Sequence, residues 1–232
     1  MPRPKRIVQD QELEQAIKNT AWAQIQEQGA AALSLRGIAR QLGIAAPSIY
    51  HYYPNRDALV TALILDAFLS LAAAQQQAYS ATSGDHQAVQ LAVLGLVYRQ
   101  WAIAQPQRYQ LVFGTPIPGY IAPEELTLPA AAACFVPLTQ VLQSALKDGK
   151  LGLKRFSPLT PALSVMLDAW AQFERGAAAE VLYLALIFWS RIHGLIMFEV
   201  NGQYPSFISD PGEVYAREIN NIVYQYLFTE EL

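Results

Sequence analysis

The stretch from Leu33 to Leu59, LSLRGIARQLGIAAPSIYHYYPNRDAL, constrains the fold of this chain more than any other part of it. Ser34 is a favourable N-cap for a short helix over Leu35–Leu42, in which apolar residues recur at the spacing of one helical face. Gly43 follows, at the place where a left-handed backbone conformation ends a helix and turns the chain. The pattern predicts a short capped helix followed by a sharp turn.

A second short helix is expected directly after this turn, over about Ala46–Tyr52. Pro47 lies at its start, where the proline ring already holds the φ angle that a helix needs. Pro54 then interrupts the chain, and Asn55 can cap a longer helix. Two short helices joined by a glycine turn predict a helix-turn-helix, the unit whose second helix lies in the major groove of DNA.

The same run resembles the DNA-binding domain of the TetR family of bacterial transcriptional regulators, and the resemblance covers about Asp10–Ala62. In that family the helix-turn-helix ends in a Tyr-x-His-Phe-like segment, and a lysine opens the fourth helix. The corresponding places here hold Tyr50, His51, Tyr52, Tyr53 and Arg56. Because glycine, proline, aromatic residues and a basic residue all fall in register, the resemblance is specific.

The sequence departs from the family pattern at three places. Ala45 stands where a serine usually caps the second helix, and the missing cap costs about 1 kcal/mol. Tyr52 replaces the family's histidine and Arg56 replaces its lysine. None of these changes removes the fold. The resemblance implies DNA contacts from a set of residues in and around the second helix, namely Arg36, Ala46, Pro47, Ser48, Tyr50, His51, Tyr52 and Arg56.

Side-chain chemistry divides this set into two roles. Pro47 offers an apolar contact to base edges, and Ser48 and His51 can form hydrogen bonds with them. Tyr50 and Tyr52 can hold phosphates through their hydroxyl groups. We therefore expect sequence to be read by the first three residues and position on the duplex to be fixed by the tyrosines.

Two arginines complete the expected DNA contacts. Arg36 can also bind a phosphate, but it is less favourably placed for this than the two tyrosines. Arg56 lies in the first turn of a helix, where the helix dipole disfavours a cation unless a phosphate lies beside it. Its alternative partner is Asp57 or solvent. Tyr53, in contrast, is expected in the core.

Charge is distributed unevenly along the chain, whose formal net charge is −3. Residues 1–60 hold seven Lys and Arg against five Asp and Glu, and the remaining residues hold nine against fourteen. A slightly cationic end on an acidic body favours a small DNA-reading domain joined to a part that does not touch DNA. The chain has a single cysteine, Cys134, which fits a reducing cytoplasm. Its basic start is not followed by an apolar run, so we expect a cytoplasmic protein without a signal peptide.

The predicted fold is all-α, with a three-helix DNA-binding domain over residues 1–60 and a helical ligand-binding and dimerisation domain over residues 61–232. Residues 1–9 are expected to form a flexible basic arm that reaches DNA, or an ordinary solvated terminus. Asp10 is expected to cap a first helix that ends near Gln28 and anchors Trp22 in the core. A helix from Asn55 to about Ser80 is expected to be the sole covalent path into the body. Further helices are expected over residues 88–104, 106–113, 128–147, 161–175 and 180–200, and after Asp210.

The helix over Glu180–Val200 is apolar on nearly every side and long enough for a membrane span. Arg191 near its middle would cost roughly 2.5–3.5 kcal/mol in a membrane, and we find no second candidate span in the body. These points favour a soluble helix that is buried on two sides, by its own domain and by a second subunit. Together with the amphipathic helix after Pro211, it predicts a homodimer that does not associate with a membrane.

A second resemblance concerns the C-terminal part. Trp189, His193 and Gly194 in WSRIHG resemble the signature of a C-terminal domain type of the TetR family that is named after its Trp-His-Gly motif, and the stretch YRQWAIAQPQRYQLVFGTP resembles it as well. The resemblance implies a pocket for an unidentified small-molecule effector, with no cofactor. Candidate lining residues are Trp101, Tyr109, Phe113, Trp170, Trp189 and His193.

Catalytic and metal chemistry find little support in the sequence. The three histidines, at 51, 86 and 193, are not at metal-ligand spacing, and no nucleophile elbow or phosphate-binding loop occurs. His193 and Cys134 could form a nucleophile pair. Alternatively, Cys134 is a buried thiol and His193 is a core histidine that is bonded to a carbonyl or to Arg191. We predict a dimeric, ligand-responsive repressor with no catalytic or metal-binding residues. The alternatives are an activator, or a helical enzyme or small-molecule or lipid carrier with only a TetR-like N-terminus.

Overall fold

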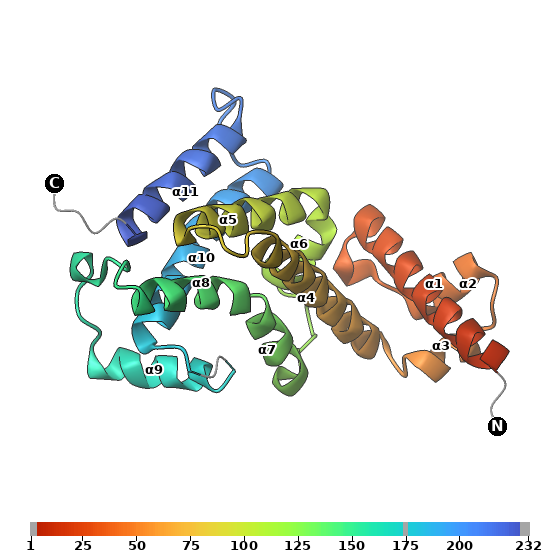
Figure 1. Ribbon diagram of the computed structural model, residues 1–232. Helices are drawn as coiled ribbons and strands as arrows, with labels where there is room; N and C mark the ends of the chain where they lie inside the picture. Colours follow the sequence, from red (N-terminus) through yellow and green to blue (C-terminus); the bar gives the residue numbers. More distant parts are fainter. Residues whose placement is uncertain (1–3, 174–175, 228–232) are drawn as a thin grey trace. The chain divides into compact units, whose positions relative to one another are not determined.

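A computed structural model describes residues 4–173 and 176–227 of the chain (Figure 1). This part of the chain contains α-helices and two single 3-10 turns and no strand, which confirms the all-α prediction. The elements are α1 (Pro4–Gln28), η1 (Ala30–Ala32), α2 (Leu35–Leu42), α3 (Ala46–Tyr52), α4 (Arg56–Ala81), α5 (Gln87–Ala104), α6 (Pro106–Phe113), α7 (Glu124–Ala133), α8 (Val136–Lys147), η2 (Leu153–Arg155), α9 (Pro161–Ala171), α10 (Ala179–Val200) and α11 (Pro211–Leu227).

The chain forms two compact units. The N-terminal unit comprises the chain up to Ala67 and the segment Gln107–Thr127, and the C-terminal unit comprises Phe68–Pro106 and the chain from Leu128 onward. The expected division was a single boundary after residue 60. The observed division differs from it because α6 and the loop after it pack with the N-terminal helices. The chain therefore passes between the units at three points, so α4 is not the sole covalent connection.

The N-terminal unit is built on α1, which packs against α2 and η1. Its apolar stripe is buried, with Ile17 and Ala21 fully buried and Trp22 8% exposed, as expected for a core anchor. Helix α1 begins at Pro4, so the expected start after Asp10 was too late, and residues 4–9 are helical where an arm was expected. Residues 1–3 of that arm lie outside the described residues. Because α2 and α3 are too short to bury a core alone, α1 supplies the surface that holds them.

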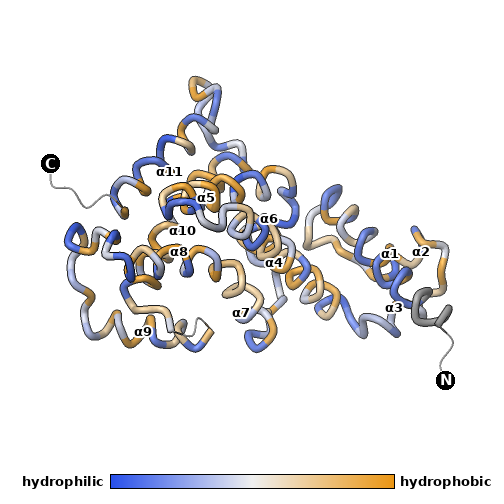
Figure 2. The backbone as a smooth tube through the Cα atoms, viewed as in Figure 1, coloured by the Kyte–Doolittle hydropathy of each residue, from blue (hydrophilic) through white to orange (hydrophobic). Residues whose placement is uncertain are grey.

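The C-terminal unit has α5 at its centre, in contact with α8, α10 and α11. Figure 2 shows that hydrophobic residues are concentrated along α4, α5 and α10. Gly95 allows α11 to approach α5 closely, and the hydroxyl of Tyr215 donates a hydrogen bond to the Gly95 carbonyl at 2.6 Å. Fully buried side chains in this core include Leu91, Leu142 and Leu182.

One expected helix, over residues 128–147, is two helices. Helices α7 and α8 are separated at Cys134 and Phe135 and bent by 51°. Pro137 explains the break, because its ring would clash with the carbonyl of Ala133 in a continuous helix and it has no N–H to donate. Helix α9 ends at Ala171, earlier than the expected 175, and residues 174–175 lie outside the described part of the chain.

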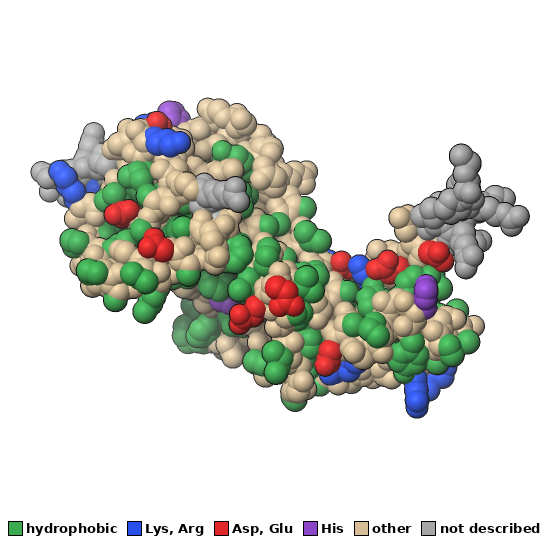
Figure 3. Space-filling model, turned by 90° about the horizontal axis from the view of Figure 1, so that it is seen from below, with side chains coloured by type: hydrophobic (Ala, Val, Ile, Leu, Met, Phe, Trp, Pro, Cys, Tyr) green, Lys and Arg blue, Asp and Glu red, His purple; other side chains and the backbone are tan. Residues whose placement is uncertain are grey.

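Two helices, α4 and α10, are long and apolar enough to cross a membrane by length and composition alone, so the expectation of no second candidate was wrong. In α10, Arg191 forms an ion pair of 2.5 Å with Glu218 of α11. Figure 3 shows hydrophobic side chains spread over the visible face of the C-terminal unit, with few charged ones among them. Val165 and Met166 of α9 are each 69% exposed, so much apolar surface remains uncovered in the single chain.

Candidate functional site

The helix-turn-helix forms as its local sequence predicts. The Ser34 side chain accepts a hydrogen bond from the backbone N–H of Gly37 at 3.2 Å and so caps α2. Gly43 has φ 65° and ψ 25°, the left-handed conformation that ends α2. Ala45 precedes α3 with an extended backbone and makes no side-chain cap. The turn therefore directs α3 away from α2 by backbone conformation alone.

Helix α3 presents one face to solvent and another to the core. Ile49 is fully buried, while Pro47, Tyr50 and His51, at positions i, i+3 and i+4, are exposed. The remaining members of the expected contact set are Arg36, which is exposed on α2, and Ala46, Ser48, Tyr52 and Arg56, which are half-buried. The structure brings Ala46–Tyr52 together on one short helix, with Arg36 on the preceding helix and Arg56 at the start of the next.

The two tyrosines at the end of α3 are held by carboxylates of α1. The Tyr52 hydroxyl donates to Oδ1 of Asp10 at 3.3 Å, and the Tyr53 hydroxyl donates to Oε1 of Glu14 at 3.0 Å. Loss of hydration, followed by the nearby Asp10 carboxylate, raises the pKa of Tyr52 above its ordinary value. Burial, followed by Glu14, raises the pKa of Tyr53, which is 5% exposed and lies in the core as expected. Asp10 therefore binds α3 and does not cap α1.

Arg56 is paired with Asp57, the alternative that the sequence offered, and it also has two backbone partners that the sequence did not indicate. One of its terminal amino groups donates to the carbonyls of Ala30 and Ala31 at 2.9 and 3.2 Å, and the other lies 3.9 Å from Asp57. The carbonyl of Ala30 also accepts from the backbone N–H of Leu33 at 3.3 Å, so the guanidinium adds a second donor there and links the start of α4 to η1. Asn55 caps α4 as predicted, since its Oδ1 accepts from the N–H of Ala58 at 2.8 Å.

Arg108 and Tyr120, in the segment Gln107–Thr127, both contact the N-terminal helices. The Arg108 guanidinium lies 5.0 Å from the centre of the Trp22 ring and also donates to the carbonyl of Asp66 at 3.3 Å. The hydroxyls of Tyr120 and Thr61 are 2.8 Å apart. This segment is therefore tied to both α1 and α4 within the N-terminal unit.

In the C-terminal unit, Trp189 and His193 lie one turn apart on α10 and meet Tyr98 of α5. The indole N–H of Trp189 donates to the Tyr98 hydroxyl oxygen at 3.3 Å, and that hydroxyl lies 2.8 Å from Nδ1 of His193. Burial lowers the pKa of His193 to about 4, so the ring is neutral at pH 7. The group offers aromatic faces and no charge.

The possible nucleophile pair is not formed. The Nδ1 of His193 is hydrogen-bonded to the hydroxyl of Tyr98, and the thiol of Cys134 donates to the carbonyl of Phe68 at 3.3 Å. Burial raises the pKa of Cys134 to about 12, which keeps it a thiol. Within residues 4–173 and 176–227, no group of three or more His, Cys, Asp or Glu side chains is placed to hold a metal ion.

Comparison with known proteins decides the family. Residues 17–63 match the family described as bacterial regulatory proteins, tetR family, and residues 91–222 match the tetracyclin repressor-like C-terminal domain. The HTH-type transcriptional regulator Rv1816 of Mycobacterium tuberculosis is 30% identical over 214 residues, which is 92% of each chain. The chain belongs to the TetR family. It is a DNA-binding transcriptional regulator.

Solved structures agree with this membership of the TetR family. The crystal structure of a regulatory protein named SCO4313 is 34% identical, covers 96% of this chain and 98% of its own, and superposes with a TM-score of 0.77. A tetR-family regulatory protein from Rhodococcus RHA1 shares the fold, with a TM-score of 0.63 at 16% identity over 93% of this chain and 97% of its own. Because the match to the family continues to residue 222, the chain does not merely carry a TetR-like N-terminus.

The expected effector residues of this TetR-family chain fall into separate groups. Trp170, Trp189 and Phe135 form an edge-to-face cluster with ring centres 5.1 and 5.5 Å apart, and His193 lies 4.7 Å from Trp189. Two further candidates are buried in packed positions. Trp101 is 5% exposed and donates to Ser70 at 3.1 Å, and Tyr109 is fully buried beside Phe113 in the N-terminal unit. Sequence reasoning missed Tyr98, although it opens the family-like stretch YRQW.

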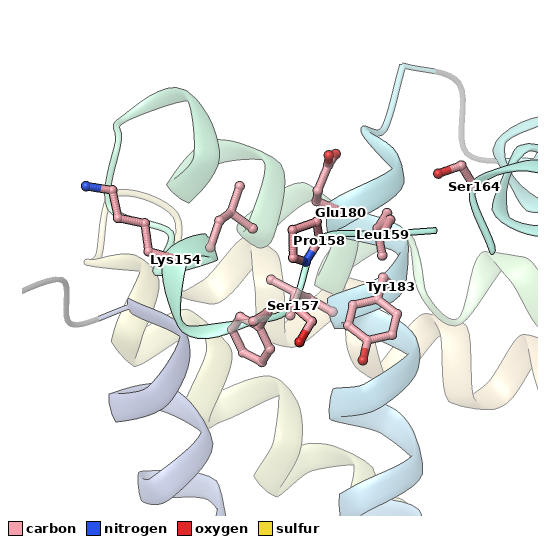
Figure 4. Close-up of a pocket in the computed structure, with 10 residues that line it drawn as sticks. Lys154, Ser157, Pro158, Leu159, Ser164, Glu180 and Tyr183 are labelled. Carbon is pink, nitrogen blue, oxygen red and sulfur yellow. The ribbon is translucent and has the colours of Figure 1, made fainter. Parts of the chain in front are cut away.

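A cavity of about 630 Å³ lies elsewhere in the C-terminal unit (Figure 4). It is lined by Leu153, Lys154, Phe156, Ser157, Pro158, Leu159, Ser164, Glu180, Tyr183 and Leu184. Figure 4 shows the side chain of Tyr183 projecting from α10 and that of Ser157 on the loop before α9, while Lys154 extends outward. None of the expected effector residues lines this cavity.

Proposed function

We propose that this TetR-family regulator is a cytoplasmic repressor that binds a near-palindromic operator as a homodimer, is released by a small-molecule effector, and performs no catalysis. The observation that carries the proposal is the exposed face of α3. Pro47, Tyr50 and His51 project from a helix whose opposite side, at Ile49, is anchored in the core. A rigidly mounted helix with small and hydrogen-bonding side chains on its outer face suits the major groove.

The outer side chains divide into base-reading and phosphate-binding groups. Ser48 and His51 would form hydrogen bonds with base edges, while Ala46 and Pro47 would contact thymine methyl groups. The phosphate ligands would be the hydroxyls of Tyr50 and Tyr52 and the guanidinium groups of Arg36 and Arg56. Arg56 retains this role only as a second one, because one of its amino groups already holds η1.

The test compares two double variants of the full chain. A duplex enriched from a random pool by the wild-type protein and a scrambled duplex of equal length serve as probes. Replacement of Ser48 and His51 together by alanine should reduce the preference for the enriched duplex, because each good pair of base contacts contributes about 1–3 kcal/mol of discrimination. The matched control replaces Ser83 and His86, exposed residues before α5, by alanine. An unchanged preference in the first variant would contradict the proposed base contacts.

Dimerisation is proposed through α10 and α11. These helices form an open cavity of about 460 Å³ that is lined by Arg191, Leu195, Val214, Arg217, Glu218 and Asn221. A second copy related by a two-fold axis would cover this apolar and polar surface and set two α3 helices roughly 34–36 Å apart, one turn of DNA. Leu195→Asp should give a folded monomer in light scattering, and Leu126→Asp on α7 should leave a dimer. A monomeric wild-type protein at micromolar concentration would refute the dimer.

The proposed effector region is the aromatic group of Tyr98, Phe135, Trp170, Trp189 and His193. A mainly apolar group with a few hydrogen-bonding atoms suits a small organic molecule. Effector binding releases DNA only if the effector binds better to a form whose α3 helices do not match successive major grooves. Native mass spectrometry of the purified protein should detect the bound molecule, and Trp189→Ala should lose it while the protein remains folded. Retention of the molecule by Trp189→Ala would place the effector elsewhere.

A further inference from the structure

Two carboxylates, one helical turn apart on α1, hold the two tyrosines that follow each other at the end of α3. The pair formed by Tyr53 and Glu14 is an internal contact, since Tyr53 is 5% exposed and Glu14 also lies 3.7 Å from Lys18. The pair formed by Tyr52 and Asp10 lies at the surface, with a distance of 3.3 Å between the oxygen atoms. The first pair therefore holds α3 in place, and the second can exchange with an external acceptor.

The hydroxyl group of Tyr52 has one proton and can donate it to one acceptor at a time. Asp10 and a DNA phosphate are both anionic acceptors, so they compete for this proton. We propose that Asp10 is an intramolecular competitor of DNA phosphate for the Tyr52 hydroxyl, and that it lowers the affinity of the protein for DNA without changing its sequence preference. This inference rests on the proposed function, in which Tyr52 binds a phosphate.

The size of the effect follows from the geometry. When Tyr52 turns to a phosphate, its hydrogen bond to the exposed Asp10 carboxylate is lost. This bond is long and lies at the surface, so its net contribution is at the low end for an intramolecular hydrogen bond, and its loss lowers affinity by about two- to threefold. Phosphates carry no sequence information, so the effect is the same on every duplex.

The experiment measures DNA affinity of the full-length protein by fluorescence anisotropy, on the enriched and the scrambled duplex. Asp10→Asn keeps the shape of the side chain and replaces a charged acceptor of the Tyr52 proton by a weaker neutral one, so binding to both duplexes should tighten by about two- to threefold. The matched control is Glu12→Gln, which removes the same charge from an exposed position two residues further along α1. Because successive helical residues are about 100° apart, Glu12 points to a different side of α1 than Asp10, and its removal should change affinity less.

Tyr52→Phe separates the inference from the function on which it rests. If Tyr52 binds a phosphate, this variant weakens binding to both duplexes, and Asp10→Asn in its background has no more effect than Glu12→Gln. An unchanged affinity of Tyr52→Phe would overturn the placement of Tyr52 at DNA, and the competition with it. A weakened Tyr52→Phe together with an unchanged or weaker Asp10→Asn would overturn the competition alone. Equal tightening by Asp10→Asn in both backgrounds would also overturn it, since Asp10 would then act by charge only.

Discussion

At Gly95, in the middle of α5, one added methyl group should lower the stability of the C-terminal unit. A Cβ atom there would overlap Cδ1 of Ile219 on α11 and lie 3.3 Å from Cζ of Phe188 on α10. Overpacking of this kind costs about 1–3 kcal/mol, and replacing a helical glycine by alanine returns about 1 kcal/mol. We expect Gly95→Ala to lower the free energy of unfolding by about 1 kcal/mol and the melting temperature by about 2–4 °C.

Gly194 in α10 provides the matched control. It is also helical, but a Cβ atom there would have no heavy atom within 4 Å, so Gly194→Ala should stabilise the protein by up to about 1 kcal/mol. The two variants should therefore differ by about 2 kcal/mol in thermal unfolding. Both are measured at one protein concentration, because assembly would shift the melting temperature. Equal shifts in the two variants would refute the assignment of close packing to Gly95.

Three further substitutions each change one local feature of the helices. Ala45→Ser should add the missing cap of α3 and raise the free energy of unfolding by about 1 kcal/mol in denaturant titration. Glu199→Gln breaks a bidentate ion pair with Arg99, 2.5–2.7 Å long and about one-fifth exposed, and should cost about 1–2 kcal/mol, whereas the exposed Glu27→Gln should cost nothing measurable. The pKa of His193 is about 4, below its ordinary value, so the unfolded chain binds more protons between pH 4 and 6.5. Acidification through this range should remove on the order of 1–2 kcal/mol of stability, allowing for partial exposure of the ring, and His193→Gln should lose that dependence.

The elements that the sequence predicted correctly depend on neighbours within a few residues. Ser34 caps α2 through the N–H of Gly37, three residues away, and Gly43 needs only its own backbone freedom. Asn55 likewise caps α4 through Ala58. Such signals can be read in one sequence because both partners lie in the same short window. Helix α3 was predictable for this reason, and so was the absence of a side-chain cap at Ala45.

The contacts that could not be predicted join residues far apart in the chain. The carbonyl partners of Arg56 lie 25 and 26 residues away, in a turn that no sequence pattern indicated. Asp10 looked like a helix cap because aspartate is a common one, but its partner Tyr52 is 42 residues further on. Nor can the sequence tell aromatic residues that line a pocket from those that fill a core. Trp101 and Tyr109 are large aromatic residues, which a core needs as often as a binding site does.

The segment that carries Arg108 changes how a signal can reach α3. Helix α4 was expected to be the sole covalent path into the body, so that any signal would have to pass along it. Arg108 instead contacts α1 at Trp22, and α1 also supplies the carboxylates that hold the tyrosines of α3. A displacement of α6 must therefore break the contact with Trp22 or move α1 with it. In the second case α1 carries the carboxylates of Asp10 and Glu14 with it. Because these carboxylates hold the tyrosines at the end of α3, helix α3 changes position even if α4 does not move.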